Sequence, residues 1–192
     1  MFGIIGDPIK HTLSPLLHNY WFEKYRIDAN YSIISSEEKN LQNIIEQIKN
    51  KTLYGINVTI PYKQKIINFI DKIVNDAEIT GSVNTLLLDK TNTVIGENTD
   101  VFGLQAAYLK EIDSNITQKA LVIGAGGVSP SVILSLQKSG VKQITITNRT
   151  KEKCLFLKKK FSYLSVLPWN KLQSQVGNFD IIVNATSLGL KN

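Results

Sequence analysis

Residues 121 to 150 restrict the possible folds of this chain more than any other segment; they read LVIGAGGVSPSVILSLQKSGVKQITITNRT. The apolar run Leu121 to Ile123 is typical of a strand buried on both faces. A glycine-rich turn follows, then a helix from Val128 to about Lys138 and a second strand from Gln143 to Thr147. This order of elements predicts a βαβ unit within a parallel sheet.

The glycine turn is typical of a dinucleotide-binding site. Gly124 permits a sharp turn, and Gly126 lets backbone N–H groups approach a pyrophosphate closely. The N-terminus of the following helix favours an anion at the same place. Ser129 stands where the common fingerprint has its third glycine, and so small a side chain still allows close packing of helix on strand. The alternative interpretation is an ordinary βα turn that binds no ligand.

The end of the second strand indicates which dinucleotide would bind. An NAD site places an Asp or Glu roughly 20 residues beyond the glycines, where it accepts a hydrogen bond from the ribose 2′-OH. This chain has Asn148, Arg149 and Thr150 there, with Lys151 and Lys153 close behind. A guanidinium binds a 2′-phosphate through paired hydrogen bonds, whereas a carboxylate would repel it. We therefore predict NADP; the alternative is that Arg149 is only a surface arginine.

Length and composition exclude several classes of protein. The 192 residues are 43% hydrophobic without an apolar run as long as a membrane span, so we expect a cytoplasmic protein. The single cysteine, Cys154, excludes an internal disulfide and fits a reducing compartment as a passive, buried or half-buried thiol. The net charge of +6 suits anionic small ligands, and the scattered lysines lack the interleaved aromatic residues of a nucleic-acid surface. His11 and His18 have no clustered partners, so no metal site is predicted.

Strand and helix signals alternate along the whole chain. The expected strands are Phe2–Ile5, Tyr31–Ser35, Tyr54–Thr59, a hairpin of Ser82–Leu88 with Val94–Ile95, Leu164–Leu167 and Phe179–Asn184. The expected helices outside the βαβ unit are Ser14–Tyr25, Glu37–Asn50, Pro61–Phe69, Thr99–Ile112 and Lys151–Phe161. The helix at Glu37–Asn50 repeats apolar residues at helical spacing, namely Leu41, Ile44, Ile45 and Ile48. The alternation predicts an α/β fold in two domains, residues 1–101 and a Rossmann-type nucleotide-binding domain at residues 102–192.

Polar residues in the first hundred positions gather where the predicted strands end, which is where α/β folds build their sites. They are Thr12 and Ser14 after the first strand, Asn57, Thr59 and Lys63 after the third, Asn84 in the hairpin, and Asp100 at a helix start. Taken singly, each has a structural explanation. Ser14 would be the N-cap of a helix with Pro15 in its first turn, Asp100 would cap another helix, and Lys63 would be a solvated surface lysine.

Together these segments resemble the shikimate dehydrogenase family over essentially the whole chain. FGIIGDPIKHTLSPLLHN is similar to the family's opening strand and serine-containing substrate loop, and GINVTIPYK to its NVTxPxK motif. GSVNTLLLD and GENTDVFG resemble its GAxNT and NTDxxG segments. GAGG, NRT and DIIVNATSLG resemble the signatures of its cofactor domain. Several signatures in the family's order are far more specific than the glycine turn alone.

The resemblance implies a reaction and a substrate. The family reversibly reduces 3-dehydroshikimate to shikimate with NADPH, in chorismate and aromatic amino-acid biosynthesis. By similarity, Thr12 and Ser14 would bind the substrate carboxylate; Thr12 replaces a serine common in the family and keeps its hydroxyl. Thr59, Asn84 and Asp100 would hold the ring hydroxyls, in a protein that is a monomer or a homodimer.

The resemblance also implies the catalytic and cofactor-binding residues. Lys63 and Asp100 would be the catalytic pair, because hydride transfer to a ketone leaves an oxygen that must take a proton, and a lysine can stabilise that oxygen and relay the proton. NADP(H) carries the hydride, and the protein supplies position and electrostatics. The expected cofactor-binding residues are Gly124, Ala125, Gly126, Gly127, Asn148, Arg149, Thr150, Lys153, Asn184, Ala185 and Thr186.

One departure from the family concerns the C-terminus. The family normally continues for several tens of residues beyond its NATSxG segment, and this chain stops at Asn192. We therefore expect a C-terminally truncated chain with about half of a doubly wound nucleotide domain, reduced stability and impaired turnover. Two alternatives stay open: a sister enzyme that accepts quinate or uses NAD, and a catalytically impaired ligand-binding fragment of the same fold. Arg149 argues against NAD, while Lys63 and Asp100 argue against a non-catalytic role.

Overall fold

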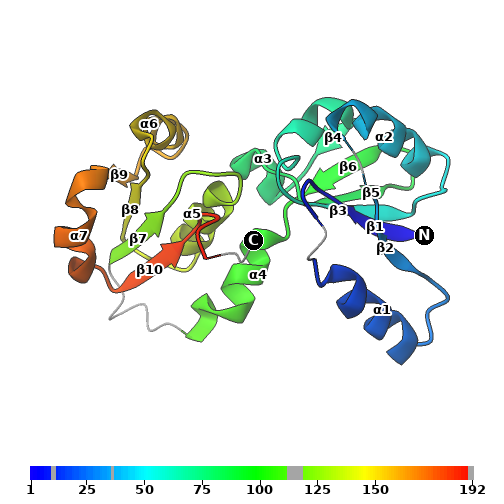
Figure 1. The fold of residues 1–192 in the computed structure, drawn as a ribbon, viewed down its shortest axis with the longest axis horizontal. Helices are drawn as coiled ribbons and strands as arrows, with labels where there is room; N and C mark the ends of the chain where they lie inside the picture. The colour runs from blue at the N-terminus through cyan, green and yellow to red at the C-terminus, as the bar shows by residue number, and fades with distance from the viewer. Residues whose placement is uncertain (10–11, 36, 112–118, 190–192) are drawn as a thin grey trace. The chain divides into compact units, whose positions relative to one another are not determined.

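Two compact units make up the chain, an N-terminal unit of Met1–Thr99 and a C-terminal unit of Asp100–Asn192 (Figure 1). The computed structural model describes all residues outside four short ranges, which are 10–11, 36, 112–118 and 190–192. Each unit combines one β-sheet with helices and has its own apolar core. The predicted α/β fold class is confirmed.

The N-terminal unit contains a six-stranded mixed sheet in the order β2-β1-β3-β5-β6-β4. Its strands are β1 (Phe2–Ile5), β2 (Tyr31–Ile33), β3 (Gly55–Val58), β4 (Lys72–Ile73), β5 (Thr85–Leu88) and β6 (Val94–Glu97). Strands β1, β2 and β3 run parallel, while β5 is antiparallel to both β3 and β6. Ile5 pairs in register with Val58, so β1 and β3 end level with each other at one edge of the sheet.

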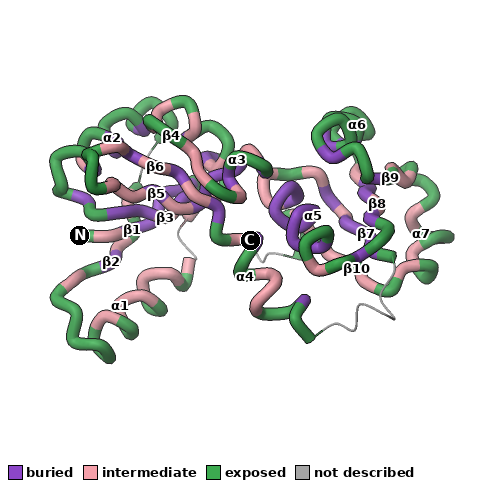
Figure 2. The backbone as a smooth tube through the Cα atoms, turned by 180° about the vertical axis from the view of Figure 1, so that it is seen from behind, coloured by how far each residue is buried: buried purple, intermediate pink, exposed green. Residues whose placement is uncertain are grey.

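The helices of the N-terminal unit cover the sheet unequally. They are α1 (Ser14–Lys24), α2 (Leu41–Lys49), α3 (Asp76–Thr80) and two 3-10 turns, η1 (Glu38–Asn40) and η2 (Lys65–Phe69). Helix α2 buries the predicted apolar stripe in the core of this unit, at Leu41, Ile44, Ile45 and Ile48. Helix α1 has no buried residue, and Figure 2 shows it in the colours of intermediate and exposed residues along its whole length.

Two local predictions in this unit are wrong. Ser14 is not the N-cap of α1: Leu13 takes that place, and Ser14 is the first helical residue, whose hydroxyl binds elsewhere. The helix expected from Pro61 is a turn that is followed only by η2. The backbone carbonyl of Lys63 accepts a hydrogen bond from the amide of Val83 (2.8 Å), which ties this turn to the segment before β5.

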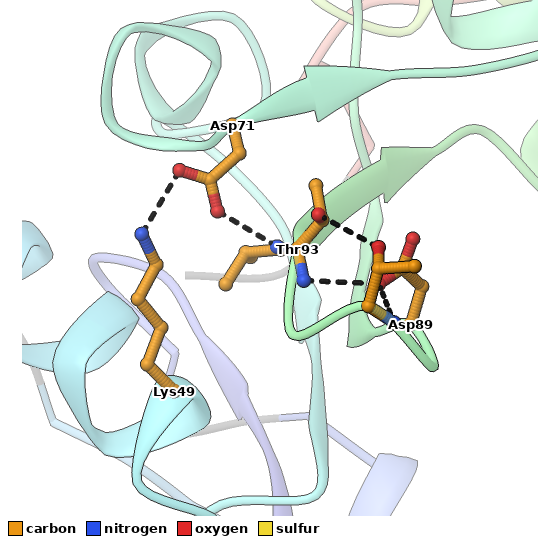
Figure 3. A network of polar contacts seen from close by, with 6 residues as sticks. Lys49, Asp71, Asp89 and Thr93 are labelled. Atoms are coloured by element: carbon orange, nitrogen blue, oxygen red, sulfur yellow. Dashed lines mark hydrogen bonds and ion pairs between the residues drawn. The ribbon is translucent and has the colours of Figure 1, made fainter.

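Charged side chains tie α2, β4 and the β5–β6 hairpin together at the surface (Figure 3). Asp71 accepts a hydrogen bond from Lys49 Nζ at 2.9 Å and another from the amide of Val94 at 2.8 Å. Asp89 accepts from the amide of Thr93 at 2.9 Å and closes the hairpin loop. These hydrogen bonds lower the pKa values of both carboxyls. These bonds hold α2, the start of β4 and the β5–β6 hairpin together, and they involve none of the candidate site residues.

The C-terminal unit contains a four-stranded, fully parallel sheet in the order β10-β7-β8-β9. Its strands are β7 (Lys119–Ile123), β8 (Gln143–Thr147), β9 (Ser165–Val166) and β10 (Ile181–Asn184). Its helices are α4 (Asp100–Ala107), α5 (Ser129–Lys138), α6 (Lys151–Lys160), α7 (Leu172–Gln175) and the 3-10 turns η3 (Leu109–Glu111), η4 (Trp169–Lys171) and η5 (Val176–Asn178). The predicted βαβ unit is confirmed as β7-α5-β8, and Ile112, the expected end of the helix after Thr99, lies outside the described residues.

Helix α5 is the central buried helix of this unit. Every residue from Ser129 to Leu136 is buried, as the continuous purple stretch in Figure 2 shows. Its hydroxyls find partners inside the unit: Ser135 Oγ donates to the carbonyls of Val101 (3.0 Å) and Ser131 (2.7 Å). Cys154 is buried as expected, and burial raises the pKa of its thiol. Of the helices in the described part of the chain, none is long and apolar enough to cross a membrane.

Candidate active site

The N-terminal unit places two predicted hydroxyls at the start of α1. Thr12 Oγ1 donates to Ser14 Oγ at 3.0 Å and accepts from the amide of Ser14 at 3.2 Å. Both side chains are half-buried. The short loop therefore holds two hydroxyls side by side, an arrangement suited to a carboxylate.

Thr59 and Lys63 lie in the turn that follows β3. The amide of Thr59 donates to the carbonyl of Ile5 at 2.9 Å, which fixes this turn against the end of β1. The approach is close: a Cβ on Gly6 would lie 2.4 Å from the Thr59 methyl, so glycine is required there. Tyr62 is buried in the core and anchors the turn, while the half-buried Lys63 follows it directly.

Asn84 is the most extensively bonded of the predicted residues. Its side-chain oxygen accepts from the amide of Thr99 at 3.0 Å, and its side-chain nitrogen donates to Thr99 Oγ1 at 3.0 Å. Its backbone carbonyl accepts from the amide of Val58 at 2.8 Å. Asn84 thereby fixes the segment that leads into Asp100, which is the first residue of α4 in the C-terminal unit.

Two further residues join this cluster: Tyr31, which was not predicted, and Asn57, which was noted at a strand end but given no role. Tyr31, at the start of β2, donates its hydroxyl proton to Asn57 Oδ1 at 2.7 Å. Asn57 Nδ2 in turn donates to the carbonyl of Asn84 at 3.3 Å and to Thr85 Oγ1 at 3.2 Å. The signal for Asn57 was strand alternation, because its neighbours Ile56 and Val58 both face the apolar core.

The environment of Tyr31 keeps its phenol neutral. Its residue is only 4% exposed, and burial raises the pKa of its hydroxyl to about 12, against a smaller lowering by a hydrogen bond from Ser14. The ring of His18 stacks on it, with ring centroids 4.2 Å apart. Partial burial lowers the pKa of His18, so its imidazole is neutral at physiological pH. His11 lies outside the described residues.

A cavity of about 320 Å³ opens on the α1 side of the sheet, beside these polar groups. Its wall is mainly apolar and aromatic and includes Phe2, Phe22 and Leu87. Asn57 and Thr85 contribute polar groups to the same wall. The cluster of hydroxyls and amides therefore adjoins a hollow within the N-terminal unit.

In the C-terminal unit, the predicted glycine turn follows β7 at the C-terminal edge of the sheet. Gly124 has a φ of +113°, and a Cβ there would lie 2.8 Å from the carbonyl oxygen of Ala185. Its amide donates to the carbonyl of Thr147 at 2.8 Å. Only glycine fits this position, whereas a Cβ on Gly126 or Gly127 would meet no atom within 4 Å. The open side of the turn, at Gly126 and Gly127, forms a cradle because neither residue has a side chain to fill it.

Ser129 closes the turn from inside. Its hydroxyl accepts from the amide of Gly126 at 3.0 Å and donates to the carbonyl of Gly124 at 3.0 Å. The amide of Gly126 is therefore used within the turn. Ser129 is the first residue of α5 and does more than replace a small glycine, because its hydroxyl sets the shape of the loop.

The predicted polar groups at the ends of β8 and β10 reach the same edge, since all strands of this sheet run parallel. Arg149, Thr150 and Lys153 are exposed beyond β8, and no carboxylate in the described part of the chain pairs with Arg149. Asn148 Nδ2 donates to the carbonyl of Thr150 at 3.1 Å. An exposed guanidinium at a strand end, next to a glycine cradle, can bind a phosphate.

The loop after β10 is folded by its own side chains. Asn184 Oδ1 accepts from the amide of Thr186 at 3.0 Å and from its hydroxyl at 2.7 Å. The amide of Ala185 donates to the carbonyl of Ile123, at the end of β7, at 2.8 Å. This loop therefore lies directly against the glycine turn, so the predicted groups after β7 and β10 come together.

Family models match one segment in the N-terminal unit and one in the C-terminal unit. The family model "Shikimate dehydrogenase substrate binding domain" matches residues 4–86, and "Shikimate / quinate 5-dehydrogenase" matches residues 107–189. The shikimate dehydrogenase (NADP(+)) of Pelagibacter ubique is 41% identical over 190 residues, which cover 99% of this chain and 70% of the relative. The chain belongs to the shikimate dehydrogenase family.

Solved shikimate dehydrogenase structures share the fold. The enzyme of Aquifex aeolicus has a TM-score of 0.90 at 36% identity and matches 100% of this chain and 70% of its own. The enzyme of Thermus thermophilus, solved in complex with NADP(H) and shikimate, has a TM-score of 0.85 at 29% identity and matches 98% of this chain and 69% of its own. The match to the substrate-binding model includes the predicted residues from Thr12 to Asn84. The match to the second model includes the glycine turn and the loop after β10.

Proposed function

We propose that this chain catalyses the reversible NADP-dependent reduction of 3-dehydroshikimate to shikimate. The observation that carries the proposal is the bonded cluster of hydroxyls and amides from Thr12 to Asn84, with Lys63 on the adjoining turn. Such a cluster matches a ring that carries a carboxylate and several hydroxyls. Membership of the shikimate dehydrogenase family supports the same substrate.

The residues of the C-terminal unit fit NADP(H). The cradle at Gly126 and Gly127 leaves room for a pyrophosphate beside the N-terminus of α5. Arg149 has no carboxylate partner in the described residues, and Thr150 and Lys153 add a hydroxyl and a second cation. We assign these residues, with Gly124, Ala125, Asn148 and the Asn184–Thr186 loop, to the cofactor. NADPH, when bound, supplies the hydride that reduces the ketone carbon of 3-dehydroshikimate.

The substrate groups follow from the chemistry of the N-terminal unit. The hydroxyls of Thr12 and Ser14 donate to the carboxylate of the substrate. Thr59, Asn84 and Asp100 hydrogen-bond the ring hydroxyls, which both accept and donate. Because the chain has a net charge of +6, its field also favours an anionic substrate and an anionic cofactor.

Lys63 is the proposed proton donor in the reduction and the proton acceptor in the oxidation. Reduction places negative charge on the carbonyl oxygen, and the ammonium of Lys63 stabilises that charge and donates the proton that completes the alcohol. In the oxidation of shikimate the neutral amine accepts the same proton. Asp100 is proposed as the carboxylate that orients the lysine and binds a substrate hydroxyl. No metal is required for these steps.

Wider properties follow from the same proposal. Residues 1–101 act as the shikimate-binding domain and residues 102–192 as the NADP-binding domain. The protein works in the cytoplasm as a monomer or homodimer and does not bind nucleic acid. These assignments rest on the composition of the chain and on its family.

The direct test is shikimate-dependent reduction of NADP⁺ by the purified chain, with NAD⁺ and quinate as alternative substrates. We expect turnover that is fastest with shikimate and NADP⁺. Lys63→Ala should lower it by about 10²–10⁴-fold. The matched control is Lys65→Ala, which removes an exposed lysine paired with Glu38 and should leave turnover unchanged. The proposal would be overturned if the wild-type chain neither turned over nor bound shikimate.

A further inference from the structure

Helix α1 carries a proposed carboxylate-binding residue but is not anchored by apolar packing. None of its residues is buried, and its large apolar side chains, such as Leu16 (73% exposed) and Tyr20 (54%), face outward. Apolar burial, which fixes α2 through four buried residues, therefore does not fix α1 in the same way. The position of Ser14 must depend on other contacts.

Those contacts converge on one residue of the sheet, Tyr31. The side chain of Asn19 bonds both backbone groups of Tyr31, donating to its carbonyl at 2.9 Å and accepting from its amide at 2.8 Å. His18 stacks on the Tyr31 ring with an interplanar angle of 11°. Ser14 acts against the rise in the pKa of the Tyr31 hydroxyl, so it lies near that hydroxyl. His18 and Asn19 follow each other on α1, so this part of the helix is attached to one tyrosine.

The direction of the hydrogen bonds through this tyrosine is fixed by a backbone carbonyl. The carbonyl oxygen of Asn84 can only accept, so the Asn57 atom that bonds it is the donor Nδ2. Asn57 Oδ1 therefore faces Tyr31, and the Tyr31 hydroxyl must be the donor at 2.7 Å. Its single proton is then used in the bond to Asn57. One tyrosine thus links α1, through Asn19 and His18, to the amide on β3.

We propose that Tyr31 is a positioning residue for shikimate: its hydroxyl sets the place of Asn57 beside Asn84, and its ring and backbone hold the helix that carries Ser14. This inference rests on the proposed function, since Ser14 and Asn84 are assigned there to opposite parts of the substrate. The hydroxyl suits the task because Tyr31 is almost completely buried and remains a neutral donor throughout the working pH range.

Tyr31→Phe isolates this role. The variant keeps the ring stacked under His18 and the backbone bonds to Asn19, and it loses the link to Asn57. Asn57 Oδ1 loses its donor, so the substrate must order the Asn57 side chain. We expect the KM for shikimate to rise about threefold to thirtyfold, the effect of one or two weakened hydrogen bonds, with the KM for NADP⁺ unchanged.

The chain offers a matched control in Tyr163. Its hydroxyl also donates to a side-chain amide oxygen, Gln137 Oε1, at 2.7 Å, and burial also raises its pKa to about 12. Tyr163 lies in the C-terminal unit and belongs to neither proposed site. Tyr163→Phe should therefore leave both KM values unchanged, although it loses a comparable hydrogen bond.

Two further variants keep the inference testable if Tyr31→Phe fails to fold. Asn57→Ala breaks the same link from its other end and should also raise the KM for shikimate alone. In an Asn57→Ala background, Tyr31→Phe should have a clearly smaller effect than in the wild type, because the two act through one bond. Additive effects would overturn a shared role.

The outcomes separate this inference from the proposed function. Wild-type turnover of shikimate with an unchanged or lowered KM in Tyr31→Phe would overturn the positioning role alone. A fall in thermal stability with both KM values unchanged would assign Tyr31 a structural role only. Absence of shikimate binding by the wild-type chain would overturn the proposed function and this inference with it.

Discussion

The two units build their candidate half-sites by different means. In the N-terminal unit the site consists of side chains that hold one another, with Thr12 bonded to Ser14 and a chain of bonds from Tyr31 through Asn57 to Asn84. In the C-terminal unit the backbone turn at Gly124 forms the centre, and the charged side chains around it stand alone. Substrate recognition is thus distributed over a network, whereas cofactor recognition depends on one turn and separate cations.

This difference determines how each half should respond to substitution. A network transmits the loss of one member to its neighbours, because each hydroxyl and amide serves two partners. A backbone turn tolerates side-chain changes around it and fails when a Cβ enters a position that has no space. The predictions below test the contrast, beginning with the largest effect.

Gly124→Ala should damage the C-terminal unit severely. The added Cβ would lie 2.8 Å from the Ala185 carbonyl oxygen, in a residue with a φ of +113°. We expect the free energy of unfolding to fall by about 2–5 kcal/mol, from backbone strain and overlap together. Urea denaturation measures it. Gly126→Ala is the control, since its Cβ would meet no atom within 4 Å; equal losses in both variants would contradict the role of the close approach.

Arg149→Gln should act locally and on one ligand. Loss of a charge-assisted contact to the 2′-phosphate should raise the KM for NADP⁺ about tenfold to hundredfold. The KM for NAD⁺ and the KM for shikimate should not change, because neither ligand carries that phosphate. Steady-state kinetics with both dinucleotides checks this. An equal rise for NAD⁺ would show that Arg149 contacts a group common to both.

Tyrosines in both units predict a loss of stability at alkaline pH. Burial raises the pKa values of Tyr31 and Tyr163 from 10.0 to about 12. Between these values the unfolded chain has released protons that the folded chain retains, so the stability present below pH 10 is lost as the pH rises through 12. Absorbance titration of the phenolates should show these two and the buried Tyr62, whose pKa burial also raises, ionising later than the other four of the seven tyrosines. Titration of all seven near 10 would be the contrary result.

Thr147→Val should have the smallest effect. Thr147 is fully buried at the end of β8, and its hydroxyl oxygen has no hydrogen-bond partner among the described residues. Replacing an unpaired hydroxyl with a methyl of similar shape should leave the free energy of unfolding within about 1 kcal/mol of the wild type or raise it. Thermal unfolding measures the change. A large loss of stability would reveal a bond that this hydroxyl makes in solution.

The same contrast explains what the sequence could predict. The glycine turn is local, and strand, turn, α5 and β8 all carry signals within thirty residues, so they were predicted closely. The links of Tyr31 to Asn57 and of Asn57 to Asn84 span 26 and 27 positions, and no local pattern encodes them. The turn found where a helix was expected from Pro61 is likewise tied to a distant residue, since the Lys63 carbonyl bonds the amide of Val83. Strand β4, which has two residues, was not predicted.

Isothermal titration of both ligands into the same variants tests the central claim most directly. Shikimate and NADP⁺ would each be titrated into the wild-type chain, Asn84→Ala and Arg149→Gln. The account predicts that Asn84→Ala weakens shikimate binding alone and that Arg149→Gln weakens NADP⁺ binding alone. It would be contradicted if either variant weakened the other ligand equally, or if the wild-type chain bound neither.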